Sequence, residues 1–281
     1  STSRGLGDVY KRQLFACVGE KESQRIFGLW NAVQTAGLLV AGMSASLFLS
    51  EHYRRGALWT VLSYSAAALL TLLLTDPEED GEKPAATAPR PGMGGLLRRS
   101  LSMTPFLAGS ALLAETAQFI TVFLSQLLYQ RAGLPVRAFG WLSMLATLCA
   151  LAGARSHRLT RRLGRRRGGA LLFLCAGAAC LTALCPAPLP AVAGVLGLRA
   201  AAALFSPLAL SLQNAAAEPG ARAAQLSCNA MVMDLVSLVL NPAFGRMADA
   251  GCGQALLLGA IACGGGLLLF LAGSKPAASP A

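Results

Sequence analysis

The chain has 281 residues, of which 54% are hydrophobic and only 13% charged, and its mean hydropathy is +0.55. Soluble globular domains carry roughly 25% charged residues, so this composition excludes an ordinary soluble domain and predicts a membrane protein. The net charge of +11 does not indicate nucleic-acid binding, because the basic residues cluster between apolar runs and lack the interleaved aromatic side chains of a stacking platform.

The first segment, residues 1–13, has neither apolar periodicity nor an initial methionine. Its string GLGDVYKRQ resembles translated adapter sequence, so we expect a non-native leader here and a true N-terminus that is missing. Residues 14–75 contain two uncharged runs, 27–49 and 56–75, joined by a short polar turn. A helix rises 1.5 Å per residue and the hydrocarbon core is about 30 Å thick, so each run predicts one transmembrane helix.

Residues 76–100 are rich in proline and acidic side chains, which predicts a linker. Six further apolar runs follow within residues 101–273, and residues 274–281 form a polar tail. Each run is long enough to span a bilayer with modest tilt. The predicted fold is therefore an all-α polytopic membrane protein with eight transmembrane helices, two before the linker and six after it. The six later runs are 103–129, 138–154, 169–185, 189–213, 223–245 and 254–273.

Basic residues distinguish the two ends of these helices. The segment 155–167, RSHRLTRRLGRRR, holds seven arginines between two apolar runs. Without the leader, its side of the membrane collects fifteen Lys and Arg residues and the opposite side only five. Cytoplasmic loops carry the excess of Lys and Arg, so we expect the linker, the arginine-rich segment and the C-terminus to be cytoplasmic.

This order of helices and loops resembles the major facilitator superfamily, whose members have two six-helix bundles joined by a long cytoplasmic loop. HRLTRRLGRR, residues 157–166, is similar to the family's loop motif G-x-L-x-D-R-x-G-R-R. Arginine stands at 161 where the family has aspartate, which leaves topology as the firmer role of this copy. The matching positions are Leu159, Arg162, Gly164, Arg165 and Arg166.

Two further segments resemble drug-efflux-like members of the family. QNAAAEPGARAA, residues 213–224, is similar to their loop between the tenth and eleventh helices, and NPAFGRMAD, residues 241–249, to the end of their eleventh helix. The resemblance implies that residues 14–75 are the fifth and sixth of twelve helices and that 101–273 is the complete C-terminal bundle. Four helices would then precede this fragment.

The resemblance implies a secondary transporter of the cytoplasmic (bacterial inner) membrane that moves a small molecule by alternating access. It further implies proton-coupled efflux by an antiporter that works as a monomer. An uptake permease for a sugar, amino acid or organic acid stays open, as does a non-transporting fragment. An intramembrane enzyme is disfavoured, because only two histidines occur and neither lies in a catalytic motif. Cysteines form no C-x-x-C pair, and we expect neither a metal nor a cofactor.

Ionisable residues inside the apolar runs are the candidate site. A charge at the bilayer centre costs about 2.5 kcal/mol or more, so such residues face a cavity or a partner. Glu115 lies near the middle of run 103–129, and Gln118 follows at i+3 on the same helix face. The family's first C-terminal helix lines the central cavity, so the resemblance favours Glu115 for cation recognition or proton coupling. A carboxylate satisfied by a neighbouring helix, without a transport role, is the alternative.

Asp234 is central in run 223–245, and Arg199 lies in the preceding run. A pair between them would neutralise both charges, and a structural role and a transport role stay open for it. Pro207 and Pro242 interrupt helical runs. Each removes a helical hydrogen bond and is either a hinge or an ordinary tolerated proline.

Overall fold

Leucine, alanine and glycine dominate the apolar runs, and these runs form helices throughout the described part of the chain. The computed structural model describes residues 37, 40, 53–72, 93–150, 153, 156–217 and 222–273. The chain divides into two compact units, Ser1–Pro89 and Arg90–Ala281. Each unit is considered by itself.

In the first unit the described element is helix α3, Tyr53–Leu72. It contains most of the predicted run 56–75, and its apolar stretch is Ala57–Thr71. The predicted leader 1–13 lies outside the described residues, and so does run 27–49 except for Gly37 and Val40.

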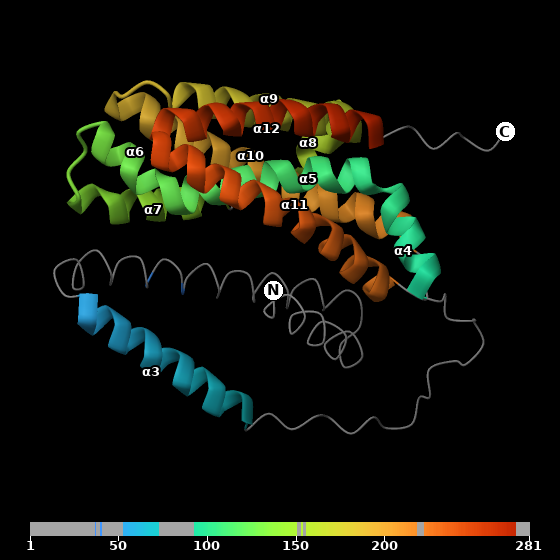
Figure 1. Cartoon of the computed structure of the whole chain (residues 1–281), viewed down its shortest axis with the longest axis horizontal. Helices are drawn as coiled ribbons and strands as arrows, with labels where there is room; N and C mark the ends of the chain where they lie inside the picture. Colours follow the sequence, from blue (N-terminus) through green and yellow to red (C-terminus); the bar gives the residue numbers. More distant parts are fainter. Residues whose placement is uncertain are drawn as a thin grey trace. The chain divides into compact units, whose positions relative to one another are not determined.

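The second unit is a bundle in which each of the six predicted runs has a helix (Figure 1). The run 103–129 is one continuous rod made of α5, a π-helical segment η2 and α6. The helices are α4 (Met93–Ser102), α5 (Thr104–Gln118), η2 (Phe119–Leu124), α6 (Ser125–Arg131), α7 (Arg137–Ala150), α8 (Ser156–Leu163), α9 (Arg165–Thr182), α10 (Pro188–Ala216), α11 (Arg222–Ala250) and α12 (Cys252–Gly273).

Four helices of the described chain are long and apolar enough to cross a membrane. Helix α9 has 18 residues, three of which are arginines, and the described part of α7 has 14 residues. The count of eight spans therefore stays a prediction. Pro207 and Pro242 both lie inside uninterrupted helices of 29 residues. The four spans are Thr104–Arg131, Pro188–Ala216, Ala224–Ala250 and Cys252–Gly273.

Two segments that we predicted to be irregular are helical. Residues 93–100, the end of the predicted linker, form most of α4. The arginine-rich segment is not an open loop, because α8 and the first turn of α9 occupy it and a single residue, Gly164, joins them. Gly164 has a φ of +79°, in the region that favours glycine. This backbone conformation explains why the loop motif has glycine at this position.

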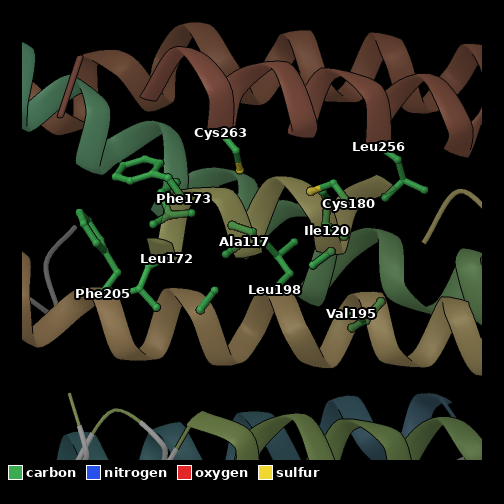
Figure 2. Close-up of a cluster of buried hydrophobic side chains, with 14 of the residues drawn as sticks. Ala117, Ile120, Leu172, Phe173, Cys180, Val195, Leu198, Phe205, Leu256 and Cys263 are labelled. Carbon is green, nitrogen blue, oxygen red and sulfur yellow. The ribbon is translucent and has the colours of Figure 1, made fainter. Parts of the chain in front are cut away.

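The core lies where α5, α9, α10 and α12 meet. Phe173 is buried there, with ring centroids 5.0 Å from Phe205 and 5.5 Å from Phe270. Phe106 joins the group from α5, 6.0 Å from Phe270. Figure 2 shows Phe173 and Phe205 together with the aliphatic side chains that continue the cluster along the bundle. Each ring comes from a different helix, so this cluster fixes the four helices relative to one another.

Small residues let the core helices approach closely, as is common where packing rather than water drives association. A Cβ at Gly109 of α5 would lie 2.7 Å from the carbonyl oxygen of Gly266 and 2.9 Å from the backbone nitrogen of Phe270, both on α12. A Cβ at Gly194 of α10 would lie 2.6 Å from the carbonyl oxygen of Ala179 on α9. These are backbone contacts, so a larger side chain has to separate the helices.

Helix α4 is attached to the bundle through a buried polar cluster. Ser100 Oγ donates to Asn229 Oδ1 at 2.9 Å, and the Gln225 side-chain amide donates to Ser100 Oγ at 2.6 Å. The Asn229 amide donates in turn to Gln213 Oε1 of α10 at 3.4 Å. All four side chains are buried. Because unpaired buried amides are costly, this cluster selects one register of α4 against α11.

Candidate functional site

Glu115 is located in the twelfth position of the 28-residue rod Thr104–Arg131, near its middle. It is half-buried and lies against α11, where the Asn241 amide nitrogen donates to Glu115 Oε2 at 3.3 Å. Asn241 itself is exposed. An amide N–H stabilises a carboxylate without neutralising it. The structure thus places an acidic group with one neutral partner on the surface of the bundle.

Immediately beyond Glu115 the helix changes its hydrogen bonding. Residues Phe119–Leu124 form a π-helix, a rare element that occurs mainly as short segments at functional positions. Thr121 Oγ1 donates to the carbonyl oxygen of Ala117 at 2.7 Å, which is the acceptor that the Thr121 N–H would use in an α-helix. Ser110 and Thr182 make the same kind of bond within α-helices, so this bond accompanies the π-helix without explaining it.

A second contact, between η2 and α11, lies beside the first. The rings of Phe119 and Phe244 stack with centroids 4.8 Å apart and an interplanar angle of 18°. Phe119 follows Glu115 by four residues, and Phe244 follows Asn241 by three, so each ring lies one turn along its own helix from the polar contact. Phe244 is fully buried and anchors the pair in the core.

Two exposed side chains extend the site. Phe123 is 64% exposed, and its centroid lies 5.8 Å from that of Phe119. Gln118, predicted to share the face of Glu115, is exposed as well. A carboxylate attracts a cation, and the faces of aromatic rings attract cations and pack against apolar groups. The arrangement suits a ligand that has both a positive charge and an apolar body.

Asp234 and Arg199 were predicted as a pair. Asp234 is exposed on α11, seven residues before Asn241 and on the same side of the helix, which is about 10 Å along its axis. Arg199 is partly exposed on α10. Their pairing stays a prediction, whereas Asp234 joins the exposed face of α11 that carries Asn241.

The loop-motif residues lie away from Glu115, at the junction of α8 and α9. Leu159 packs against the core, while the motif arginines are exposed. Arg166 donates from Nη2 to the carbonyl oxygen of Leu271 at 3.4 Å, in the last turn of α12. Carbonyls in the last turn have no helical partner, so an arginine there stabilises the helix end.

Sequence reasoning did not find Phe119, Phe123 or Phe244. The spacing of Glu115, Phe119 and Phe123 by four residues is a signal in hindsight, but an aromatic stripe at helical spacing is also typical of core packing. Asn241 appeared in the sequence interpretation only as the first residue of the segment NPAFGRMAD. Within the described residues, no group of three or more His, Cys, Asp or Glu side chains could hold a metal ion.

Comparison with known proteins identifies the family. Residues 13–239, most of the chain, match the family model described as Major Facilitator Superfamily. Searches of curated proteins and of solved structures returned no match. The family match agrees with the helical bundle and its membrane-length apolar helices, and it confirms the membership predicted from the loop motifs. The chain therefore belongs to the Major Facilitator Superfamily, and it is an integral membrane protein of this family of secondary transporters.

Proposed function

We propose that this transporter exports lipophilic cations in exchange for protons and that Glu115 is the shared binding group. The hydrogen bond between Asn241 and Glu115, 3.3 Å long at the middle of the rod, carries the proposal. It holds the carboxylate at one point on the bundle surface. Gln118 and Asp234 add polar groups on the neighbouring helix faces, and Phe119 and Phe123 supply the aromatic surface.

Exchange follows from competition for one carboxylate. An ionised Glu115 binds a cation, whereas a protonated Glu115 has no charge with which to hold it. Proton binding from the acidic side of the membrane then releases the cation, and proton loss on the other side prepares the carboxylate for the next one. Asn241 supports the ionised state, because its N–H is a donor to the carboxylate.

Alternating access requires helices that bend or rotate about a site near the midplane. The π-helix Phe119–Leu124 borders Glu115, and Pro242 follows Asn241 directly. Proline and π-helical segments are the common causes of bends in helices. The two helices that form the site therefore each have a weak point beside it. The excess of Lys and Arg on the side of the arginine-rich segment favours a cytoplasmic position for that segment. Export across the cytoplasmic membrane by a single copy of the protein rests on the resemblance to drug-efflux-like members of the family.

Asn241→Leu tests the proposal. A hydrogen bond to a charged group contributes about 1.5–3 kcal/mol, so we expect the Kd of the purified protein for tetraphenylphosphonium at neutral pH to rise by about tenfold or more. The matched control is Ser237→Ala, one turn away on α11, where the hydroxyl donates only to the carbonyl oxygen of Met233 at 3.2 Å on its own helix. Isothermal titration in detergent measures all three Kd values.

An unchanged Kd in Asn241→Leu would show that the contact with Glu115 is structural only. An equal loss in Ser237→Ala would mean that any polar substitution on α11 weakens binding, and the specific role of Asn241 would be wrong. If the wild-type protein binds the cation no better than a neutral compound of the same size, the cationic substrate class is wrong.

A further inference from the structure

The arginines of α8 form one face of a helix. Arg158, Arg161 and Arg162 are exposed, whereas Ser156 is buried and Leu159 is half-buried. At 100° per residue the three arginines lie on one side of the helix and the two inner residues on the other. The segment is thus an amphipathic helix with a basic outer face.

The inner face of α8 fixes the helix to the bundle. Ser156 Oγ donates to the carbonyl oxygen of Leu204 on α10 at 2.7 Å, and Leu159 packs against the hydrophobic core. Helix α8 also packs along α9, as Figure 1 shows near the end of the bundle. The basic face therefore has a defined direction.

Helix α9 continues this face with three more arginines, Arg165–Arg167, in its first turn. The residue before it, Gly164, offers no side-chain cap, and no acidic residue occurs in that turn. The N-terminal end of a helix carries partial positive charge, so three arginines raise an already positive potential. The six exposed arginines of α8 and α9 are called the basic face below.

Within the described residues, no acidic side chain balances the charge of the basic face. Arg166 donates to a backbone carbonyl, and none of the other five makes an ion pair in the described part of the chain. The six arginines do not belong to the proposed transport site, because Glu115 lies about 17 Å along its rod from the end at Thr104. As far as the described residues show, the basic face is therefore available to an external anion.

The surroundings of Arg167 indicate which anion. Leu171 and Leu174 follow it at i+4 and i+7 on the same face of α9, and they are 41% and 59% exposed. Helix α9 contains most of the predicted membrane run 169–185, and an exposed apolar stripe on a helix that spans a membrane faces lipid tails. Arg167 lies about 6 Å from Leu171 along the helix axis, which is the level of the lipid headgroups.

We propose that the basic face binds the headgroups of anionic phospholipids. A soluble acidic peptide would find the same charge but would not match the leucine stripe that continues it. Each arginine near an anionic membrane surface strengthens binding by roughly fivefold. The proposal goes beyond transport, since it assigns a lipid partner to a part of the chain that the site at Glu115 does not use.

The test is native mass spectrometry of the purified full chain in dodecyl maltoside, titrated with phosphatidylglycerol and with phosphatidylcholine. We expect phosphatidylglycerol to bind at least about tenfold more tightly. The triple variant Arg158→Gln, Arg161→Gln, Arg162→Gln should lose roughly 100-fold in phosphatidylglycerol affinity. The matched control replaces three exposed arginines outside the basic face, as Arg131→Gln, Arg137→Gln and Arg246→Gln, and should keep the wild-type affinity.

A second triple variant, with lysine at 158, 161 and 162, separates charge from folding. It should bind phosphatidylglycerol within about fivefold of wild type, because the lipid surface responds to charge. The proposal is overturned if the glutamine variant keeps its affinity, if the lysine variant loses as much as the glutamine variant, or if the control loses as much. It is also overturned if excess inorganic phosphate displaces the lipid completely, or if a polyglutamate peptide binds more tightly than phosphatidylglycerol.

Discussion

Replacing Glu115 by glutamine abolishes proton-coupled transport while the protein stays folded in the membrane. Glutamine has nearly the same shape, and its carbonyl oxygen can still accept the bond from Asn241, so the contact between α5 and α11 persists. The neutral side chain cannot exchange a proton for a cation. We expect the rate of tetraphenylphosphonium export by the protein to fall by about 100-fold or more, which is a typical loss for a positioned proton-transfer group.

The control is Asp249→Asn, which removes an exposed carboxylate near the end of α11. Its export rate should equal that of wild type at every external pH, and both should depend on pH. Transport by Glu115→Gln that keeps the wild-type rate and pH dependence would exclude Glu115 as the coupling group and would favour the structural reading of this carboxylate.

The second large effect concerns the packing of α5 against α12. Gly109→Leu introduces a side chain where even a Cβ would lie 2.7 Å from the Gly266 carbonyl oxygen. The obstacle is backbone, so the helices have to separate. We expect a loss of about 3 kcal/mol or more in the free energy of unfolding, which corresponds to a fall of about 10 °C in the thermal midpoint. Thermal unfolding in detergent measures the midpoint.

Gly264→Leu is the matched control, because Gly264 lies on α12 two residues before Gly266 and a Cβ there would meet nothing within 4 Å. Its midpoint should stay within about 3 °C of wild type, since a change at an open surface position is usually small. If the thermal midpoint of Gly264→Leu fell as far as that of Gly109→Leu, leucine would destabilise the protein even at an open position. The close approach at Gly109 would then not be the cause.

Much of the bundle could be predicted, because a membrane helix depends on the length of its apolar run. The run predicted at 254–273 matches α12, and run 189–213 lies within α10. Helix α9 begins four residues before its predicted start, at Arg165, because arginines at a helix end can reach water while the backbone stays helical. Helix α8 was not predicted for the same reason, because its arginines also reach water from a helical backbone. The alternation of Ser156 and Leu159 with the arginines is the sequence feature that indicates this helix.

The site was predictable only in part. Glu115 was identified because it is a lone carboxylate in an apolar run. The free-energy cost of a charge in a membrane makes such a residue a candidate for function. Its partner Asn241 lies 126 positions away in the sequence, and the stack of Phe119 on Phe244 depends on how two helices meet. Such contacts arise from tertiary packing, so periodicity within one helix cannot give them.

The site also differs from the core in its surroundings. Phe173, Phe205 and Phe270 join three helices through buried rings, while Glu115 and Asn241 meet at the edge of the bundle between a π-helix and a proline. Alternating access, as proposed above, requires helices that can bend near the site. Movement of α5 and α11 near their weak points can then expose Glu115 without unfolding the bundle.

Proton movement coupled to the cation tests the central claim most directly. The purified protein is reconstituted in vesicles that contain a pH-sensitive dye, without any imposed proton gradient, and tetraphenylphosphonium is added outside. If one carboxylate is shared, entry of the cation drives protons out and the vesicle interior becomes more alkaline, and Glu115→Gln abolishes this signal. Cation entry without a change of internal pH in the wild-type protein would contradict the exchange of cation and proton at Glu115.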